Sequence, residues 1–72
     1  MTLRELKPGQ SGRVLRVHGQ GALPQRLLEM GLTPGVELRV LKPAPLGDPI
    51  QLQLRGYTLS LRKAEAALVE LM

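Results

Sequence analysis

The chain is 72 residues long, contains no cysteine and carries a formal net charge of +4 at pH 7. Its length predicts a single domain over residues 1–72, and the lack of cysteine excludes disulfides and thiolate metal sites. Tyr57 is the only aromatic residue, which excludes base stacking on aromatic rings and an aromatic groove for proline-rich peptides.

No apolar run is long enough to span a bilayer, and the first residues lack the apolar core of a secretory signal. We therefore expect a cytoplasmic protein that does not insert into membranes.

The first predicted strand covers residues 12–18 and follows a Pro-Gly turn at residues 7–10. Its apolar residues Val14, Leu15 and Val17 do not alternate with polar ones. We therefore expect part of this strand to be covered on both faces.

A short helix follows, and the sequence indicates its start and its faces. Gly21 can serve as the N-cap, and Pro24 then lies in the first turn, where its missing N–H breaks no intrahelical bond. Arg26 faces outward and Leu28 lies off the apolar stripe, so we expect both to be accessible. The apolar residues at helical spacing, which predict the inward stripe, are Leu23, Leu27 and Met30.

The end of this helix is also predicted. Gly31 can take the left-handed conformation, and Leu32 then folds back towards Leu27 in a Schellman motif. Residues 33–36, with the sequence Thr-Pro-Gly-Val, suit a type II turn with proline second and glycine third. Helix and turn together form a short connector between two strands.

Three further strands, over residues 36–42, 50–55 and 57–61, show the period-two alternation of strands with one buried face. Arg55 and Gly56 separate the last two strands, so we expect a tight hairpin there. The residues assigned to the buried faces are Val36, Leu38 and Val40, then Ile50, Leu52 and Leu54, and then Tyr57, Leu59 and Leu61.

Proline stiffens the loop over residues 43–49, and Leu46 lies at its tip. A stiff loop loses little entropy when it binds a partner, so Leu46 is a candidate contact residue. The alternative, which we weigh equally, is a rigid linker whose leucine packs onto the end of the domain.

The C-terminal stretch fits either a helix or a strand. Residues 62–66 are rich in helix formers, whereas residues 68–71 suit a strand. Several antiparallel strands expose their edges unless the sheet closes on itself, so we predict one helical turn followed by a closing strand. The residues thus predict a small, closed, mainly β domain with one inserted helix.

Four motifs occur in order along the chain. They are Leu-x-Pro-Gly-Gln at residues 6–10, Gly-Ala-Leu-x-Gln-Arg-Leu-Leu-Glu-Met-Gly-Leu-Thr-Pro-Gly at 21–35, Ala-Pro-Leu-Gly-Asp-Pro-Ile at 44–50 and Arg-Gly-Tyr-x-Leu-Ser-Leu-Arg at 55–62. Together they resemble the FeoA family, which comprises small cytosolic accessory proteins of bacterial ferrous-iron uptake. Pro24 departs mildly from the family pattern, which more often has a polar residue there.

The resemblance implies an SH3-like β-barrel of about five antiparallel strands, with a short helix after the first strand and a helical turn before the last. It also implies a partner, the FeoB transporter, which is a membrane protein with a cytosolic GTPase domain.

The residues offer little to a metal ion or to catalysis. His18 is the only histidine and the acidic residues are scattered, so two histidines and a carboxylate cannot meet within one chain. No nucleophile motif accompanies His18, and we expect neither enzyme activity nor a cofactor. We interpret His18 as a solvated or capping residue. The alternative is a metal site that His18 shares with a carboxylate of a neighbouring chain in a homo-oligomer.

Recognition is the function that remains. The candidate contact residues are Arg26, Leu28, Met30 and Leu46, provided that the helix and the proline-rich loop lie at one end of the domain. The alternative is that Leu28 and Met30 lie entirely in the core. We predict a protein-binding module for the cytosolic part of an FeoB-like transporter. One alternative is a small nucleic-acid-binding barrel, which the charge permits but the dispersed basic residues oppose. Another is an SH3-like module related to those of iron-dependent repressors.

Overall fold

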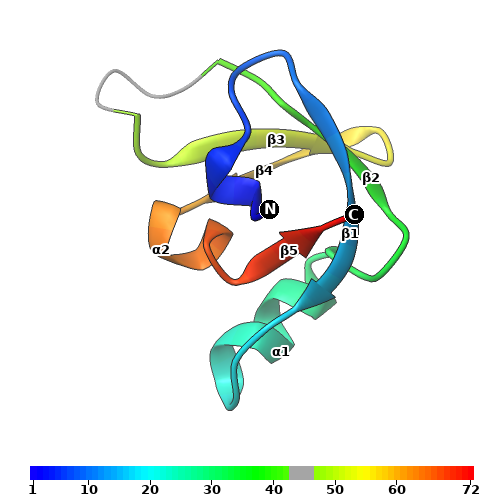
Figure 1. The fold of residues 1–72 in the computed structure, drawn as a ribbon, viewed down its shortest axis with the longest axis vertical. Coiled ribbons are helices and arrows are strands. Elements are labelled where there is room, and N and C mark those ends of the chain that lie inside the picture. The colour runs from blue at the N-terminus through cyan, green and yellow to red at the C-terminus, as the bar shows by residue number, and fades with distance from the viewer. Residues whose placement is uncertain (43–46) are drawn as a thin grey trace.

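The computed structural model describes residues 1–42 and 47–72. Its elements are the 3₁₀ turn η1 (Leu3–Glu5), β1 (Ser11–Val17), α1 (Ala22–Glu29), β2 (Glu37–Val40), β3 (Ile50–Leu54), β4 (Tyr57–Leu61), α2 (Lys63–Ala66) and β5 (Val69–Leu71) (Figure 1). The strands pair antiparallel in the order β4-β3-β2-β1-β5. The predicted mainly β fold, with a helix after the first strand and a helical turn before the last, is confirmed.

The last strand does not close the sheet by pairing with the fourth. In the described part of the chain β5 pairs with β1, and its other edge is taken by the N-terminus. Thr2 forms an isolated bridge with Glu70, and the Leu71 amide donates to the Met1 carbonyl at 2.8 Å. Because β5 is only three residues long, this short N-terminal segment is enough to cover it.

An irregularity in β1 explains why its apolar residues do not alternate. Val14 pairs with Leu71 and Arg16 pairs with Glu70, so the register shifts at Leu15. A bulge of this kind changes the face on which the following side chains lie. Val14 is therefore fully buried, whereas Leu15 is only half-buried.

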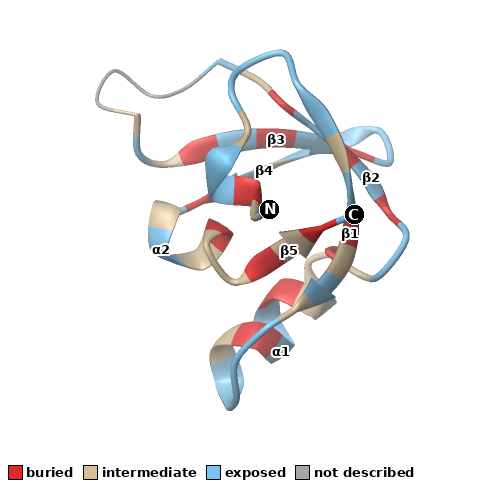
Figure 2. Cartoon of the chain, viewed as in Figure 1, coloured by how far each residue is buried: buried red, intermediate tan, exposed pale blue. Residues whose placement is uncertain are grey.

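The core is aliphatic and lies inside the bend of the sheet (Figure 2). The predicted buried faces of β2 and β3 are confirmed, because their burial alternates residue by residue. The prediction for β4 is partly wrong. Leu61 is buried, but Leu59 is half-buried and Tyr57 keeps 40% of its surface exposed. The reason is that β4 ends the pairing order, so no strand of residues 1–42 and 47–72 lies beyond it on that side.

The connector between β1 and β2 has the predicted helix stop. Gly31 has φ +108°, its amide donates to the Leu28 carbonyl at 3.0 Å, and the Leu32 amide donates to the Leu27 carbonyl at 3.2 Å. These two bonds define a Schellman motif. The type II turn follows, with the Val36 amide 3.1 Å from the Thr33 carbonyl.

The inward stripe of α1 differs from the prediction. Leu27 is fully buried, but Leu23 and Met30 are only half-buried, and Pro24 takes a buried place beside Leu27. Pro24 lies near Gly19 and, like Leu27, sits on the barrel side of the helix. Proline in the first turn therefore contributes to packing as well as fitting the helix start.

Tyr57 joins the β3–β4 hairpin to the end of α1. Its hydroxyl donates to the Met30 carbonyl at 2.6 Å, which satisfies one of the free carbonyls at the helix end. A Cβ atom built at Gly31 would collide with the same hydroxyl. Glycine is thus needed at position 31 both for its backbone angle and for the close approach of Tyr57.

We predict that Gly31→Ala destabilises the fold more than Gly35→Ala. Gly35 is the matched control, because it has φ +90° but nothing lies within 4 Å of its Cβ position. The left-handed backbone costs alanine about 1–2 kcal/mol at either site. At Gly31 the clash adds roughly 1–3 kcal/mol. The measurement is chemical denaturation of both variants.

The same pair compared in a Tyr57→Phe background separates the two effects. Phenylalanine lacks the hydroxyl, so the difference between the two alanine variants should shrink there. Equal losses for both variants in the wild-type background would contradict the close approach.

Candidate functional site

The residues predicted from the helix lie on α1 and at its C-terminal end. Arg26 is exposed, whereas Leu28 and Met30 are half-buried. Met30 packs against the core, and its carbonyl accepts the Tyr57 hydroxyl. We call Arg26, Leu28 and Met30 the helix surface. Leu28 has the partial exposure expected for it, and the helix forms one end of the molecule (Figure 1).

Leu46, the fourth predicted contact residue, lies outside the described residues. The described chain directly after it is attached to α2. Asp48 Oδ1 accepts the Lys63 amide at 3.0 Å, and the Lys63 side chain lies beside Gly47. The role of Leu46 alongside the helix surface stays a prediction.

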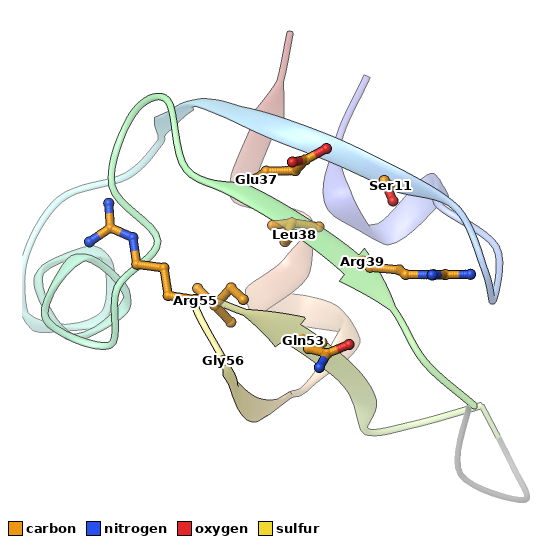
Figure 3. A pocket seen from close by; sticks show the side chains of 8 residues that line it. Ser11, Glu37, Leu38, Arg39, Gln53, Arg55 and Gly56 are labelled. Atoms are coloured by element: carbon orange, nitrogen blue, oxygen red, sulfur yellow. The ribbon is translucent and has the colours of Figure 1, made fainter.

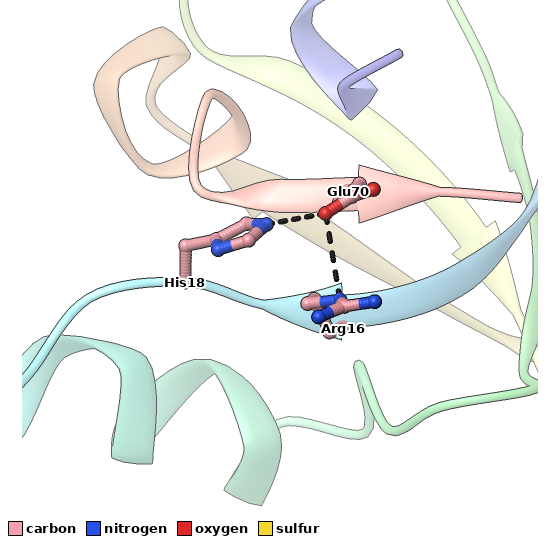
Figure 4. Close-up of polar contacts among 3 residues, drawn as sticks. All are labelled: Arg16, His18 and Glu70. Carbon is pink, nitrogen blue, oxygen red and sulfur yellow. Dashed lines mark hydrogen bonds and ion pairs between the residues drawn. The ribbon is translucent and has the colours of Figure 1, made fainter.

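His18 lies at the end of β1 and joins a small polar cluster with Arg16 and Glu70 (Figure 4). His18 Nε2 lies 2.5 Å from Glu70 Oε1, and Arg16 Nε lies 3.5 Å from the same oxygen. The cluster links β1 to β5 just after the bulge. The cluster was not predictable from the sequence, because it depends on the irregular pairing of β1 with the distant strand β5.

The cluster lowers the pKa of the Glu70 carboxyl. The hydrogen bond with His18 is the largest cause, and the positive charge of Arg16 adds to it, whereas partial burial opposes both. A hydrogen bond and a nearby cation both favour the ionised carboxylate. Glu70 therefore ionises more readily in the folded chain than in the unfolded one.

The same cluster is poorly suited to a metal ion. Within residues 1–42 and 47–72, no group of three or more histidine and carboxylate side chains comes together. Glu70 is the one carboxylate at His18, and the guanidinium of Arg16 beside it repels a cation. His18 contacts the Glu70 side chain, and both its solvated or capping role and a metal site shared between chains stay predictions.

A hollow of about 330 Å³ lies on the outer face of the sheet (Figure 3). One row of polar residues crosses it, since Arg39 pairs with Ser11 on β1 and with Gln53 on β3. Arg39 and Arg55 point in different directions at its two sides, so their charges do not converge on one point. The alternating polar positions of β2 and β3 were the sequence signal for this face.

The model of the FeoA domain matches residues 1–72 of the chain. The chain belongs to the FeoA domain family. A similar curated protein is the Fe(2+) transport protein A/Fe(2+) transporter FeoB fusion protein of Porphyromonas gingivalis, strain ATCC BAA-308 / W83. It is 40% identical over 70 residues, which are 97% of this chain. The chain spans only 8% of the length of that fusion protein.

Two solved structures share both sequence and fold with this FeoA domain. Iron(II) transport protein A from Clostridium thermocellum is 41% identical with a TM-score of 0.91, and the match covers 99% of this chain and 44% of that chain. FeoA of Stenotrophomonas maltophilia, solved with zinc, is 34% identical with a TM-score of 0.87, over 100% and 89% of the two chains. The latter is a procaryotic SH3 domain protein, and the SH3-like fold expected here is confirmed.

No helix in residues 1–42 and 47–72 of the FeoA domain has the length and hydropathy needed to cross a bilayer.

We predict that Glu70→Gln lowers stability at neutral pH and not in acid. Because the folded-state pKa of Glu70 lies below the ordinary carboxyl value of 4.5, ionised Glu70 stabilises the fold above that pH. This contribution is lost as the pH falls through the lowered pKa. The difference in unfolding free energy between wild type and Glu70→Gln should therefore narrow below about pH 4.5 and then vanish. Denaturation at fixed ionic strength over pH 3–7 measures it.

The control for this prediction is the same substitution in a His18→Gln background. Removing His18 removes the largest cause of the lowered pKa, so the difference at neutral pH should be smaller there. An effect of Glu70→Gln that is independent of pH would contradict the assignment.

We also predict that the monomer has no stoichiometric, micromolar Fe(II) site. Anaerobic titration calorimetry of the isolated chain measures this, with His18→Gln as the matched variant. A micromolar site of one ion per chain on the monomer would contradict the prediction, and its loss in His18→Gln would identify His18 as a ligand. A site that appears only in a dimer would support the shared-ligand alternative.

Proposed function

We propose that this FeoA domain is an accessory module of bacterial ferrous-iron uptake, that it acts in the cytoplasm by docking on an FeoB-like transporter, and that it catalyses no reaction. The supporting observation is the Porphyromonas gingivalis relative, in which an FeoA part and an FeoB part are named as one fusion protein. Covalent fusion holds two modules at about millimolar effective concentration. Fusion of two modules into one chain is therefore an advantage when the two modules act in contact with each other.

The helix surface suits such a contact because it is held rigidly. The Schellman motif fixes the end of α1, and Tyr57 attaches that end to the β3–β4 hairpin. A surface that is ordered before binding loses little conformational entropy when it docks. Leu28 and Met30 supply accessible apolar area, and Arg26 supplies an exposed charge beside them.

To regulate a transporter, the module must bind one state of the partner better than another. The helix surface offers flexible methionine and leucine side chains, which adapt to more than one partner shape. The alternatives of a nucleic-acid-binding barrel or a repressor-type module have weaker support. In the outer-face hollow, the two arginines diverge and Glu37 lies among them.

We predict that Arg26→Glu weakens binding to the cytosolic GTPase part of an FeoB-like transporter by about tenfold or more. Arg4→Glu is the matched control, because Arg4 is also exposed but lies on η1. Binding of each variant is measured by calorimetry against the cytosolic part and by co-purification with the complete transporter, in each nucleotide state. Leu46→Ala is measured in the same series.

Three results would contradict this proposal. The first is the absence of binding in every nucleotide state. The second is equal weakening by Arg26→Glu and Arg4→Glu, which would indicate only general charge. The third is salt-dependent binding to DNA or RNA with a slope of several phosphate contacts, which would favour the nucleic-acid alternative.

A further inference from the structure

The two end strands of the sheet differ in what lies along their outer edges. The outer edge of β5 is covered by Met1 and Thr2. The outer edge of β4 meets no strand in the described part of the chain, because β4 ends the pairing order. An edge strand presents a row of unpaired N–H and C=O groups, and proteins normally protect it.

The unpaired groups of β4 belong to Thr58 and Ser60. In an antiparallel pair, hydrogen-bonded residues alternate with residues whose polar groups point away from the partner strand. Leu54 and Tyr57 flank the two-residue turn and form the first hydrogen-bonded pair, so Leu59 also bonds to β3. The amides and carbonyls of Thr58 and Ser60 therefore point outward along the open edge.

The inner side of β4 is also incompletely covered. Leu52 on β3 is fully buried, but Leu59, its partner across the ladder, is only half-buried. Tyr57 is 40% exposed on the same strand. A sixth strand placed beside β4 would bury the remaining apolar surface of both side chains if its inward residues were apolar.

Three common protections against strand addition, namely a charge, a proline and a bulge, are missing from β4. The strand has the sequence Tyr-Thr-Leu-Ser-Leu, with no charge, no proline and no bulge in its pairing. Exposed Arg55 and Arg62 lie just beyond its two ends. The edge is thus uncharged in the middle and has an arginine beyond each end. At the Arg62 end, the carboxylates of Glu65 and Asp48 accept the Arg62 and Lys63 amides, so the unbalanced positive charge is at the Arg55 end.

These charges decide between two possible occupants. In a second copy paired antiparallel with Thr58 opposite Ser60, the end of β4 that carries Arg55 would lie beside the end of the other copy that carries Arg62. Like charges placed opposite each other destabilise a strand pair. A strand from another protein with acidic residues at both ends has no such penalty and complements Arg55 and Arg62.

We propose that the edge of β4 is a strand-addition site for an extended segment of a partner protein. The segment alternates apolar and small polar residues in its middle and carries acidic residues at both ends. Backbone bonds to Thr58 and Ser60 provide affinity, and the inward apolar residues cover Tyr57 and Leu59. This site lies on β4, adjoins the helix surface through the contact of Tyr57 with Met30, and does not depend on the transporter proposal.

The experiment uses the whole chain and the peptide acetyl-Glu-Glu-Val-Thr-Val-Thr-Val-Glu-Glu-amide. Hydrogen exchange of each amide is followed by NMR with and without the peptide. We expect exchange at Thr58 and Ser60 to slow by about tenfold or more at saturation. The amides of Tyr57 and Leu59, which already bond to β3, should change less.

Peptide controls and one protein variant sharpen the test. The same peptide with lysine in place of glutamate should bind about tenfold more weakly or worse. Two further peptides are methylated on alternate backbone nitrogens. The peptide whose methylated nitrogens face β4 should lose binding, and the peptide whose methylated nitrogens face away from β4 should keep it. Ser60→Pro removes one outward N–H and should reduce binding, with its unfolding midpoint measured alongside.

The proposal is overturned if the two amides stay unprotected at millimolar peptide, or if protection appears instead around Arg39 and Arg55 in the hollow. Equal binding of the lysine peptide would also overturn it. Protection that grows with protein concentration in the absence of peptide would identify a second copy as the occupant. Because the transporter is absent from this experiment, its outcome is independent of the docking test.

Discussion

The hydrogen bond from the Tyr57 hydroxyl to the Met30 carbonyl sets the position of the helix on the barrel. It joins two segments that are far apart in the chain, the β3–β4 hairpin and the end of α1. It is possible only because Gly31 has no side chain, so one glycine and one tyrosine act together. An eight-residue helix is too short to be stable alone, and this attachment holds it as a rigid surface.

The helix surface and the open edge of β4 are the two candidate contact surfaces, and the order of the strands places the second of them. Among the described residues, Met1 and Thr2 cover β5 at one end of the sheet, and no strand pairs with the outer edge of β4 at the other. The helix surface presents side chains, whereas the β4 edge presents backbone groups. The two surfaces use different elements and adjoin where the Tyr57 hydroxyl contacts the Met30 carbonyl.

Local chemistry made much of this fold predictable. The Schellman motif at Gly31, the tight hairpin at Arg55 and Gly56, and the alternation of β2 and β3 each depend on a few neighbouring residues. What could not be predicted depends on distant pairing. The bulge at Leu15 brings Arg16 and Glu70 together, and the end position of β4 exposes Tyr57. Likewise, the buried place of Pro24 depends on where the helix meets the barrel.

Tyr57 is the only aromatic side chain in the sequence. All near-ultraviolet absorption and intrinsic fluorescence of the side chains therefore come from the residue that attaches the helix. Loosening of this junction changes the surroundings of the phenol even while the strands stay paired. Tyr57 thus reports spectroscopically on the contact between α1 and the β3–β4 hairpin. Spectroscopy of the unlabelled protein can distinguish local opening of this contact from loss of the whole sheet.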